Sequence, residues 1–281
     1  MATKKTTATN ETWSSSLHLS FRLLLPKRTP NLQPFLSADG LHKSKLLPRL
    51  PYDVARAKGK SSEAGPDPRR YRDGKQLYET IGLVYENSGG DLHVTDLGKA
   101  TLRWLNLIDE KNSIILGRHA AYALAACQLR NPTGWGSQYD QSVEVFPFSF
   151  IWRAMLALDD CISSDELNRS LFRVQSKKEL SDAISTIKSV RQGGSLDDLG
   201  AETVSGDKKD DRIIPWMAMA SFGWTLISDK RGKGGRYCIM SRSRELVRQA
   251  ASVHHKHRDF SSVEEYVSHI SRAAALPEDV R

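Results

Sequence analysis

The order of the predicted secondary structure restricts the fold of this chain most strongly, because the same order occurs twice. In the first half, apolar residues at helical spacing predict a helix over residues 69–81. Two strand-like runs, GLVYE and DLHVT, follow on either side of NSGG, where Asn and Gly supply the positive backbone angles of a hairpin turn. Thr95 or Asp96 then caps a helix that ends near Leu107.

The second half repeats the order of helix, hairpin and helix. The segment DDRIIPWMAMASFGW predicts a helix that ends at Gly223, and WTLISDKRGKGGRYCIM reads as two strands around a glycine-rich, basic turn. The segment SRSRELVRQAASVHHKH predicts the following helix, and SSVEEYVSHISRAA predicts a last one, capped at Ser261 or Ser262.

An amphipathic helix lies earlier in this half. Ser176 and Glu179 form a capping box. The apolar stripe runs from Leu180 to Val190, and polar residues that include Lys188 and Arg191 are expected to face away from it.

A helix that is apolar on nearly every face, KNSIILGRHAAYALAACQLR, joins the two halves and is expected to be buried. NPTGWG ends it, and an aromatic-rich packed connection follows. The predicted fold is therefore mainly α with short β-hairpins, in two similar units joined by a buried helix. The expected divisions are 1–40 as a flexible basic arm, 41–110 as the first unit, 111–147 as a helical connector, 148–252 as the second unit and 253–281 as a C-terminal helix.

In both units the hairpin leads through a polar cap into a helix, TDLGKATLRWL and SRSRELVRQ. This pattern resembles the winged-helix fold: VTDLGKA resembles the exit from a wing, and CISSDEL resembles the short strand and second helix of such a module. The resemblance covers roughly residues 42–110 and 148–252. Two winged-helix-like units with a basic arm are similar to the DNA-recognition regions of bacterial restriction endonucleases and related defence proteins. The resemblance implies duplex DNA binding, with the helix before each wing in the major groove and the wing on phosphates or in the minor groove.

The charge distribution agrees with an anionic partner. The formal net charge is +8, of which residues 1–50 carry +6. The Ser/Thr-rich, basic opening segment is typical of an arm that follows a phosphate backbone, and its composition also fits an organellar transit peptide.

Cations and one amide gather on the predicted recognition elements. The first helix is rich in donors of the kind that bind phosphates and guanine edges. The second wing carries cations beside glycines, and the glycines let a phosphate approach the backbone. A solvated turn is the alternative for the wing, and a core helix is the alternative for the apolar segment after Arg212. The candidate DNA-binding residues are Arg69, Arg70, Arg72, Lys75, Gln76, Arg212, Lys230, Arg231, Lys233, Arg236, Arg242 and Arg244.

Evidence for catalysis in the sequence is weak. Asp67 with Asp73-Gly74-Lys75 imitates the acid and acid-x-Lys pattern of a magnesium-dependent nuclease, but these residues fall at a predicted helix entry and not on paired strands. Neither a G-x-S-x-G motif nor a phosphate-binding P-loop is present. We therefore expect a binding protein without catalytic residues or a cofactor, whose partners are double-stranded DNA and a catalytic protein subunit. A magnesium-dependent nuclease and a helical protein-interaction subunit remain as alternatives.

Cysteines and histidines point to neither disulfides nor metal. Cys127, Cys161 and Cys238 are scattered in apolar runs, which favours buried thiols in a reducing compartment over disulfides. The cluster from His254 to His257 has no suitably spaced acid or cysteine and is interpreted as a solvated helix end.

The location is inferred from the same features. No run of about 18 apolar residues is present to cross a membrane. The expected location is the bacterial cytoplasm, in association with the nucleoid, or an organelle if the N-terminus is a transit peptide.

Overall fold

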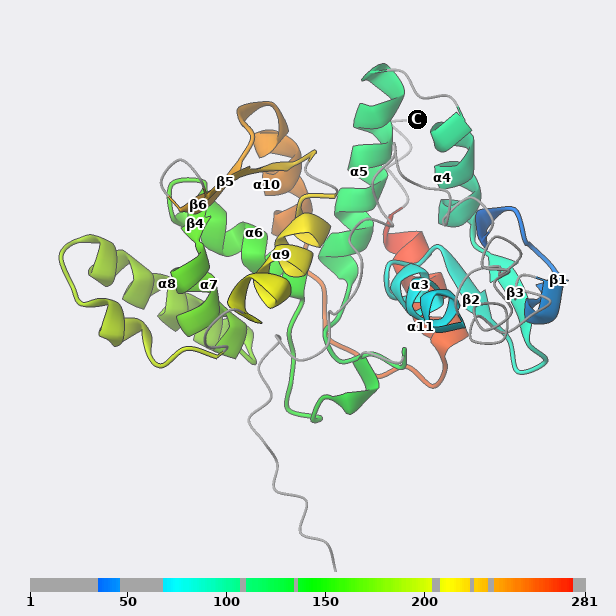
Figure 1. The fold of residues 1–281 in the computed structure, drawn as a ribbon, viewed down its shortest axis with the longest axis horizontal. Helices are drawn as coiled ribbons and strands as arrows, with labels where there is room; N and C mark the ends of the chain where they lie inside the picture. The colour runs from blue at the N-terminus through cyan, green and yellow to red at the C-terminus, as the bar shows by residue number, and fades with distance from the viewer. Residues whose placement is uncertain are drawn as a thin grey trace, which may run out of the picture.

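Two small antiparallel sheets and the helices around them make up the computed structural model, which describes residues 35–45, 68–106, 110–133, 136–203, 208–222, 225–231 and 235–274. Within these residues the chain is mainly helical, as the sequence predicts, and the two sheets lie on either side of α5 (Figure 1). The helices are α3 Pro68–Thr80, α4 Asp96–Asn106, α5 Glu110–Ala126, α6 Pro147–Ala157, α7 Ser164–Arg169, α8 Lys177–Arg191, α9 Lys208–Ala220, α10 Arg244–Ser252 and α11 Val263–Ala273.

The first sheet contains the predicted hairpin. Its strands are β1 Leu41–His42, β2 Val84–Glu86 and β3 Asp91–Val94, and β3 lies in the middle. In the turn, Asn87 Oδ1 accepts a hydrogen bond from the amide of Asp91 at 2.9 Å, and Gly90 has a φ of 85°. A side chain is rarely stable at such an angle, which explains the glycine.

The second sheet has the same strand order. Its strands are β4 Cys161–Ser163, β5 Ile227–Lys230 and β6 Arg236–Ile239, with β6 between the other two. In each half a helix therefore precedes a hairpin whose second strand pairs with a short strand from earlier in the chain.

Helix starts follow the predicted caps. Thr95 Oγ1 accepts a hydrogen bond from the amide of Gly98 at 3.0 Å, and α4 begins at Asp96. Gly98 is required here, because a Cβ at this position would overlap the carbonyl oxygen of Leu83. Ser176 and Ser262 cap α8 and α11 in the same way.

The predicted buried connector is α5, which packs against α4 and α11 of the first half and against α6 and α10 of the second. It ends at Ala126, before the predicted Arg130. Helix α11 returns from the end of the chain to the first half, where the hydroxyl of Tyr266 donates to the carbonyl of Thr80 at 3.0 Å. The first half is therefore completed by the C-terminal helix.

The prediction that Arg191 faces away from the core is wrong. Its guanidinium donates to both carboxylate oxygens of Glu166, at 2.7 and 2.9 Å, and to the carbonyl oxygens of Leu158 and Cys161. Helical spacing places Arg191 beside the apolar stripe, and the long side chain of Arg191 reaches back to the carboxylate of Glu166. Because Glu166 is buried, its charge needs a partner.

The interpretation of all three cysteines as free thiols is also wrong. Cys161 and Cys238 form a disulfide between β4 and β6. They occupy directly opposite positions of the ladder, with Cα atoms 4.1 Å apart, although 77 residues separate them in the sequence. Cys127 remains a buried thiol, and burial raises its pKa to about 12.

The histidine cluster is not a helix end. Helix α10 stops at Ser252, and the histidines lie on the segment that crosses to the first half. His255 and His257 are half-buried against Phe146, with ring centroids 5.8 and 6.1 Å away. Gln128 fixes the segment by donating to the carbonyl of Arg258 at 2.8 Å and accepting from its amide at 3.1 Å.

Candidate nucleic-acid interface

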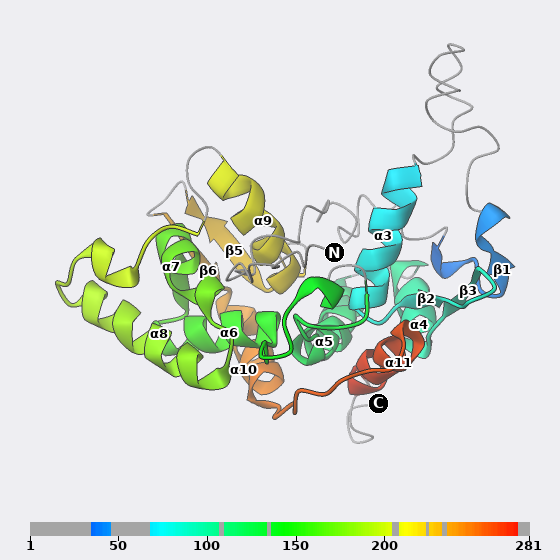
Figure 2. The same cartoon turned by 90° about the horizontal axis from the view of Figure 1, so that it is seen from below.

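The two candidate recognition helices begin on the same side of the molecule. Figure 2 shows that α3 and α9 both begin on one side of the molecule, and β5 and β6 lie beside α9. The side chains of Arg69, Arg70, Arg72 and Arg212, and the whole of Lys233, lie outside what the structure describes.

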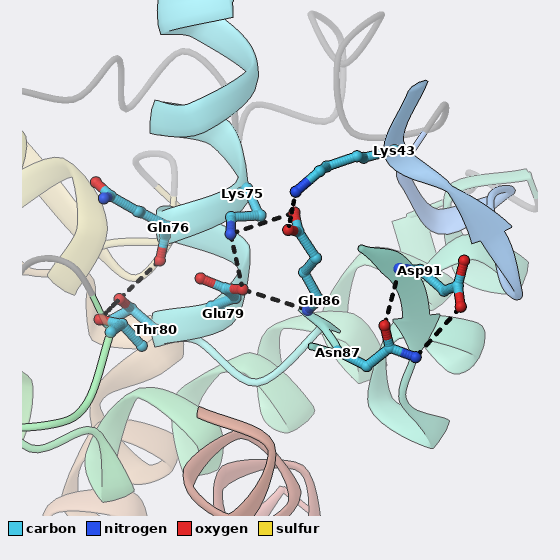
Figure 3. Close-up of polar contacts among 9 residues, drawn as sticks. Lys43, Lys75, Gln76, Glu79, Thr80, Glu86, Asn87 and Asp91 are labelled. Atoms are coloured by element: carbon cyan, nitrogen blue, oxygen red, sulfur yellow. Dashed lines mark hydrogen bonds and ion pairs between the residues drawn. The ribbon is translucent and has the colours of Figure 1, made fainter. Parts of the chain in front are cut away.

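Lys75 belongs to an ion-pair network that joins α3 to the first hairpin (Figure 3). Its Nζ lies 3.6 Å from Glu79 and 3.4 Å from Glu86, and Glu86 also accepts from Lys43 at 2.7 Å. Two lysines and two glutamates meet in this network, and both lysines are paired with Glu86. Lys75 therefore fixes the orientation of α3 on the hairpin and leaves little excess charge for a phosphate.

Glu79 is the more deeply buried of the two carboxyl groups. It is only 3% exposed, and this burial raises its pKa to about 7, although Lys75 and the amide of Glu86 favour the charged form. Glu86 is more exposed, and the two lysines outweigh the effect of its burial, so its pKa lies below the ordinary value.

Gln76 lies on a different face of α3. Figure 3 shows its side chain pointing away from the side that carries Lys75 and Glu86. Its backbone carbonyl accepts from the hydroxyl of Thr80 at 2.8 Å, and its side chain is half-buried.

The second wing presents exposed cations. Lys230 and Arg236 occupy opposite positions on β5 and β6, next to the turn, and both are exposed. Four cations and one carboxylate leave residues 229–236 with a net charge of +3. Like charges directly opposite each other destabilise a hairpin, so this arrangement is a cost that an anion would relieve.

Arg231 is held more tightly than its neighbours. Its guanidinium donates to both oxygens of Asp229, at 2.9 to 3.1 Å, and lies 5.4 Å from the ring centroid of Tyr237. The hydrogen bonds from Arg231 lower the pKa of Asp229. Asp229 thus orients Arg231 and cancels part of its charge.

Arg242 and Arg244 lie at the other end of the hairpin, because β6 runs from the turn toward them. Arg242 is exposed in the turn before α10, and Arg244 donates to Asp160 at 2.7 Å. A four-residue strand spans about 13 Å, so these two arginines and the wing turn form separate positive patches.

Helix α9 is largely a core helix after its first turns. Ile213 and residues 215–220 are buried, and Trp216 packs against Phe148 and Phe172. The structure thus agrees with the alternative interpretation of this segment.

Asp229 and Lys43 are the functional neighbours that the sequence reasoning missed. Asp229 and Arg231 are two positions apart in the sequence, so a local pattern pointed to their pairing. Lys43 lies 43 residues from its partner Glu86 and had none.

In the described ranges, no three His, Cys, Asp or Glu side chains are grouped to hold a metal ion. Gly74 and Lys75 of the nuclease-like pattern lie inside α3, and Asp67 lies outside the described residues. None of the described helices combines the length and apolar character needed to span a lipid bilayer.

Comparison of the sequence with protein-family models and with curated proteins finds no match.

Proposed function

We propose that this chain binds duplex DNA through two winged-helix-like units, with α3 reading base edges and the β5–β6 wing contacting phosphates. The observation that carries the proposal is the wing itself, where Lys230 and Arg236 are exposed and directly opposite each other in a hairpin of net charge +3. Gly232, Gly234 and Gly235 lie between these cations in the sequence, so a phosphate ribbon can approach the backbone.

The arrangement of the two halves supports the same proposal. Each sheet places its last strand between the other two, and a helix precedes each hairpin, which supports the resemblance to winged-helix modules. Helices α3 and α9 begin on one side of the molecule (Figure 2), so a single duplex could meet both.

Helix α3 is the stronger candidate for base reading. Lys75 and Glu86 anchor its C-terminal half to the hairpin, and a rigidly held helix can place its side chains reproducibly against bases. Its first turns carry Arg69, Arg70 and Arg72. In α9 the buried second half limits contact to the first turns, which include Arg212.

The remaining parts follow from this function. The basic residues 1–40 track phosphates outside the recognised site and add affinity without sequence preference. Cleavage is supplied by a catalytic subunit of a restriction or defence system, to which this chain delivers the recognised DNA.

Selection from a randomised duplex pool at two salt concentrations tests the proposal. We expect one sequence to be enriched at both concentrations. Substitution of Arg69, Arg72 or Gln76 by Ala should then cost about 1 to 3 kcal/mol on the enriched duplex only, for at least one of the three. If no sequence is enriched from the pool, the chain binds DNA only without sequence preference. Weak, salt-insensitive binding together with a stoichiometric protein partner would instead support the interaction-subunit alternative.

A further inference from the structure

A pocket of about 310 Å³ lies outside the proposed DNA-binding elements. It opens between α6, the first residue of α8 and the segment that follows α10, and none of its lining residues comes from α3, α9, β5 or β6. In Figure 2 the segment after α10 runs along the side opposite to the one where α3 and α9 begin.

The floor of the pocket is mainly apolar. Phe146, Ser149 and Phe150 line it and are all buried, and the ring of His255 lies against Phe146. An aromatic floor of this kind suits a flat ring.

The walls and rim are basic. Arg153, Lys177 and Lys256 line the pocket against one carboxylate, Glu144. Arg153 is fixed, because its Nε donates to the carbonyl of Ala251 at 2.8 Å and its Nη2 to that of Val253 at 3.2 Å. Lys177 and Lys256 are exposed at the rim, where their ammonium groups can close over an anion.

His255 lines the pocket and carries a buried ring nitrogen, Nε2, without a hydrogen-bond partner among the described residues, whereas the nitrogens of His257 face Gln128 and Arg130. Buried polar atoms are nearly always paired, so this nitrogen calls for a partner. Burial also lowers the pKa of His255 to about 4, which keeps the imidazole neutral at neutral pH and able to donate one hydrogen bond.

We propose that this pocket binds a small phosphate monoester carried on a planar ring, of the size of a mononucleotide. The volume is at the lower end for ligand pockets, which fits a ligand of mononucleotide size. The phosphate lies among Arg153, Lys177 and Lys256, and the ring lies on Phe146 and Phe150. The concave shape and the position away from α3 and the wing favour a free small molecule over duplex DNA.

Calorimetric titration of the full chain tests this assignment with adenosine monophosphate as the probe. We expect saturable binding, with adenosine and inorganic phosphate each at least about tenfold weaker, since each lacks one half of the recognised chemistry. The double variant Lys177→Ala/Lys256→Ala should weaken binding about tenfold. Lys178→Ala removes an exposed charge from the next position of α8, outside the pocket, and should leave the affinity unchanged.

Three results would overturn the assignment. These are equal affinity for adenosine and its monophosphate, equal affinity of the double variant and the parent, and displacement of the bound nucleotide by an unphosphorylated duplex. The last would assign the pocket to the DNA-binding surface. Both lysines are exposed, so circular dichroism should show the same fold for all the variants.

Discussion

Replacement of Arg191 by Met removes the cation that ties the end of α8 to the turn before β4. The guanidinium makes four hydrogen bonds of 2.7 to 2.9 Å, two to Glu166 and one each to the carbonyls of Leu158 and Cys161. The side chains of Arg191 and Glu166 are only 17% and 9% exposed. The variant therefore removes two hydrogen bonds from a carboxylate and one from each of two carbonyls in a nearly dry environment, although Glu166 keeps the Ser163 amide and Leu158 keeps the Cys161 amide as donors.

The expected cost follows from this geometry. Breaking a buried ion pair by removing one partner costs about 3 to 5 kcal/mol. We expect about 3 kcal/mol, because Glu166 keeps the hydrogen bond from the amide of Ser163 and Met refills the space of the arginine stem. In the parent, burial opposes ionisation of Glu166, but Arg191 and the Ser163 amide outweigh it and hold the pKa below its ordinary value. Without Arg191 the pKa of Glu166 rises, so Glu166 becomes neutral at a higher pH. The stability difference between the variant and the parent should therefore be smaller at acid pH than at neutral pH.

Urea unfolding followed by tryptophan fluorescence measures this loss, since Trp152 and Trp216 are buried in the same half. Lys188→Met is the control, because Lys188 is exposed on the same helix and its replacement should change stability by about 0.5 kcal/mol or less. If Arg191→Met costs less than about 1 kcal/mol, or no more than the control, the pair does not hold α8 in place.

Three further predictions concern stability. Gly98→Ala should lower the unfolding free energy by about 2 kcal/mol, because the added Cβ would overlap the carbonyl of Leu83. Gly74→Ala should be neutral or raise it by about 0.5 to 1 kcal/mol, because no atom lies nearer than 3.6 Å to the added Cβ, and equal urea midpoints for the two variants would refute this contrast. Burial lowers the pKa of His255 to about 4, so as the pH drops this imidazole binds a proton in the unfolded chain before it does so in the folded one. The unfolding free energy should therefore fall as the pH drops from about 6.5 to about 4. His255→Gln should flatten that part of the stability profile, and an unchanged profile would contradict the assignment. Reduction of the disulfide between Cys161 and Cys238 should lower the unfolding free energy by about 2 to 4 kcal/mol, whereas Cys161→Ser/Cys238→Ser should not respond to reductant.

Local features of the fold could be predicted and distant ones could not. Thr95, Ser176 and Ser262 cap helices through contacts with residues three positions away, so their patterns are visible in the sequence. The pairing of Lys43 with Glu86 and of Cys161 with Cys238 depends on which strands meet in a sheet, and hairpin patterns alone do not specify a third strand.

The candidate site shows the same division. The basic turn, with Lys230 and Arg236 exposed beside it, follows from the composition of this segment. Charge counting, however, treats Lys75 and Arg231 as free cations, and the structure engages them with Glu79, Glu86 and Asp229. Nearby carboxylates decide which cations remain for a phosphate.

The salt dependence of DNA binding by Lys230→Ala/Arg236→Ala tests the central claim most directly, since these two exposed cations are not held by Asp229. If both contact phosphates, the slope of log affinity against log salt should flatten by about 1.8 relative to the parent. Lys178→Ala/Lys188→Ala removes the same charge from the exposed face of α8 and should leave the slope near that of the parent. Fluorescence anisotropy of a labelled duplex at several salt concentrations gives all three slopes. Equal slopes for the parent and both folded variants would contradict the proposal that the β5–β6 wing binds DNA.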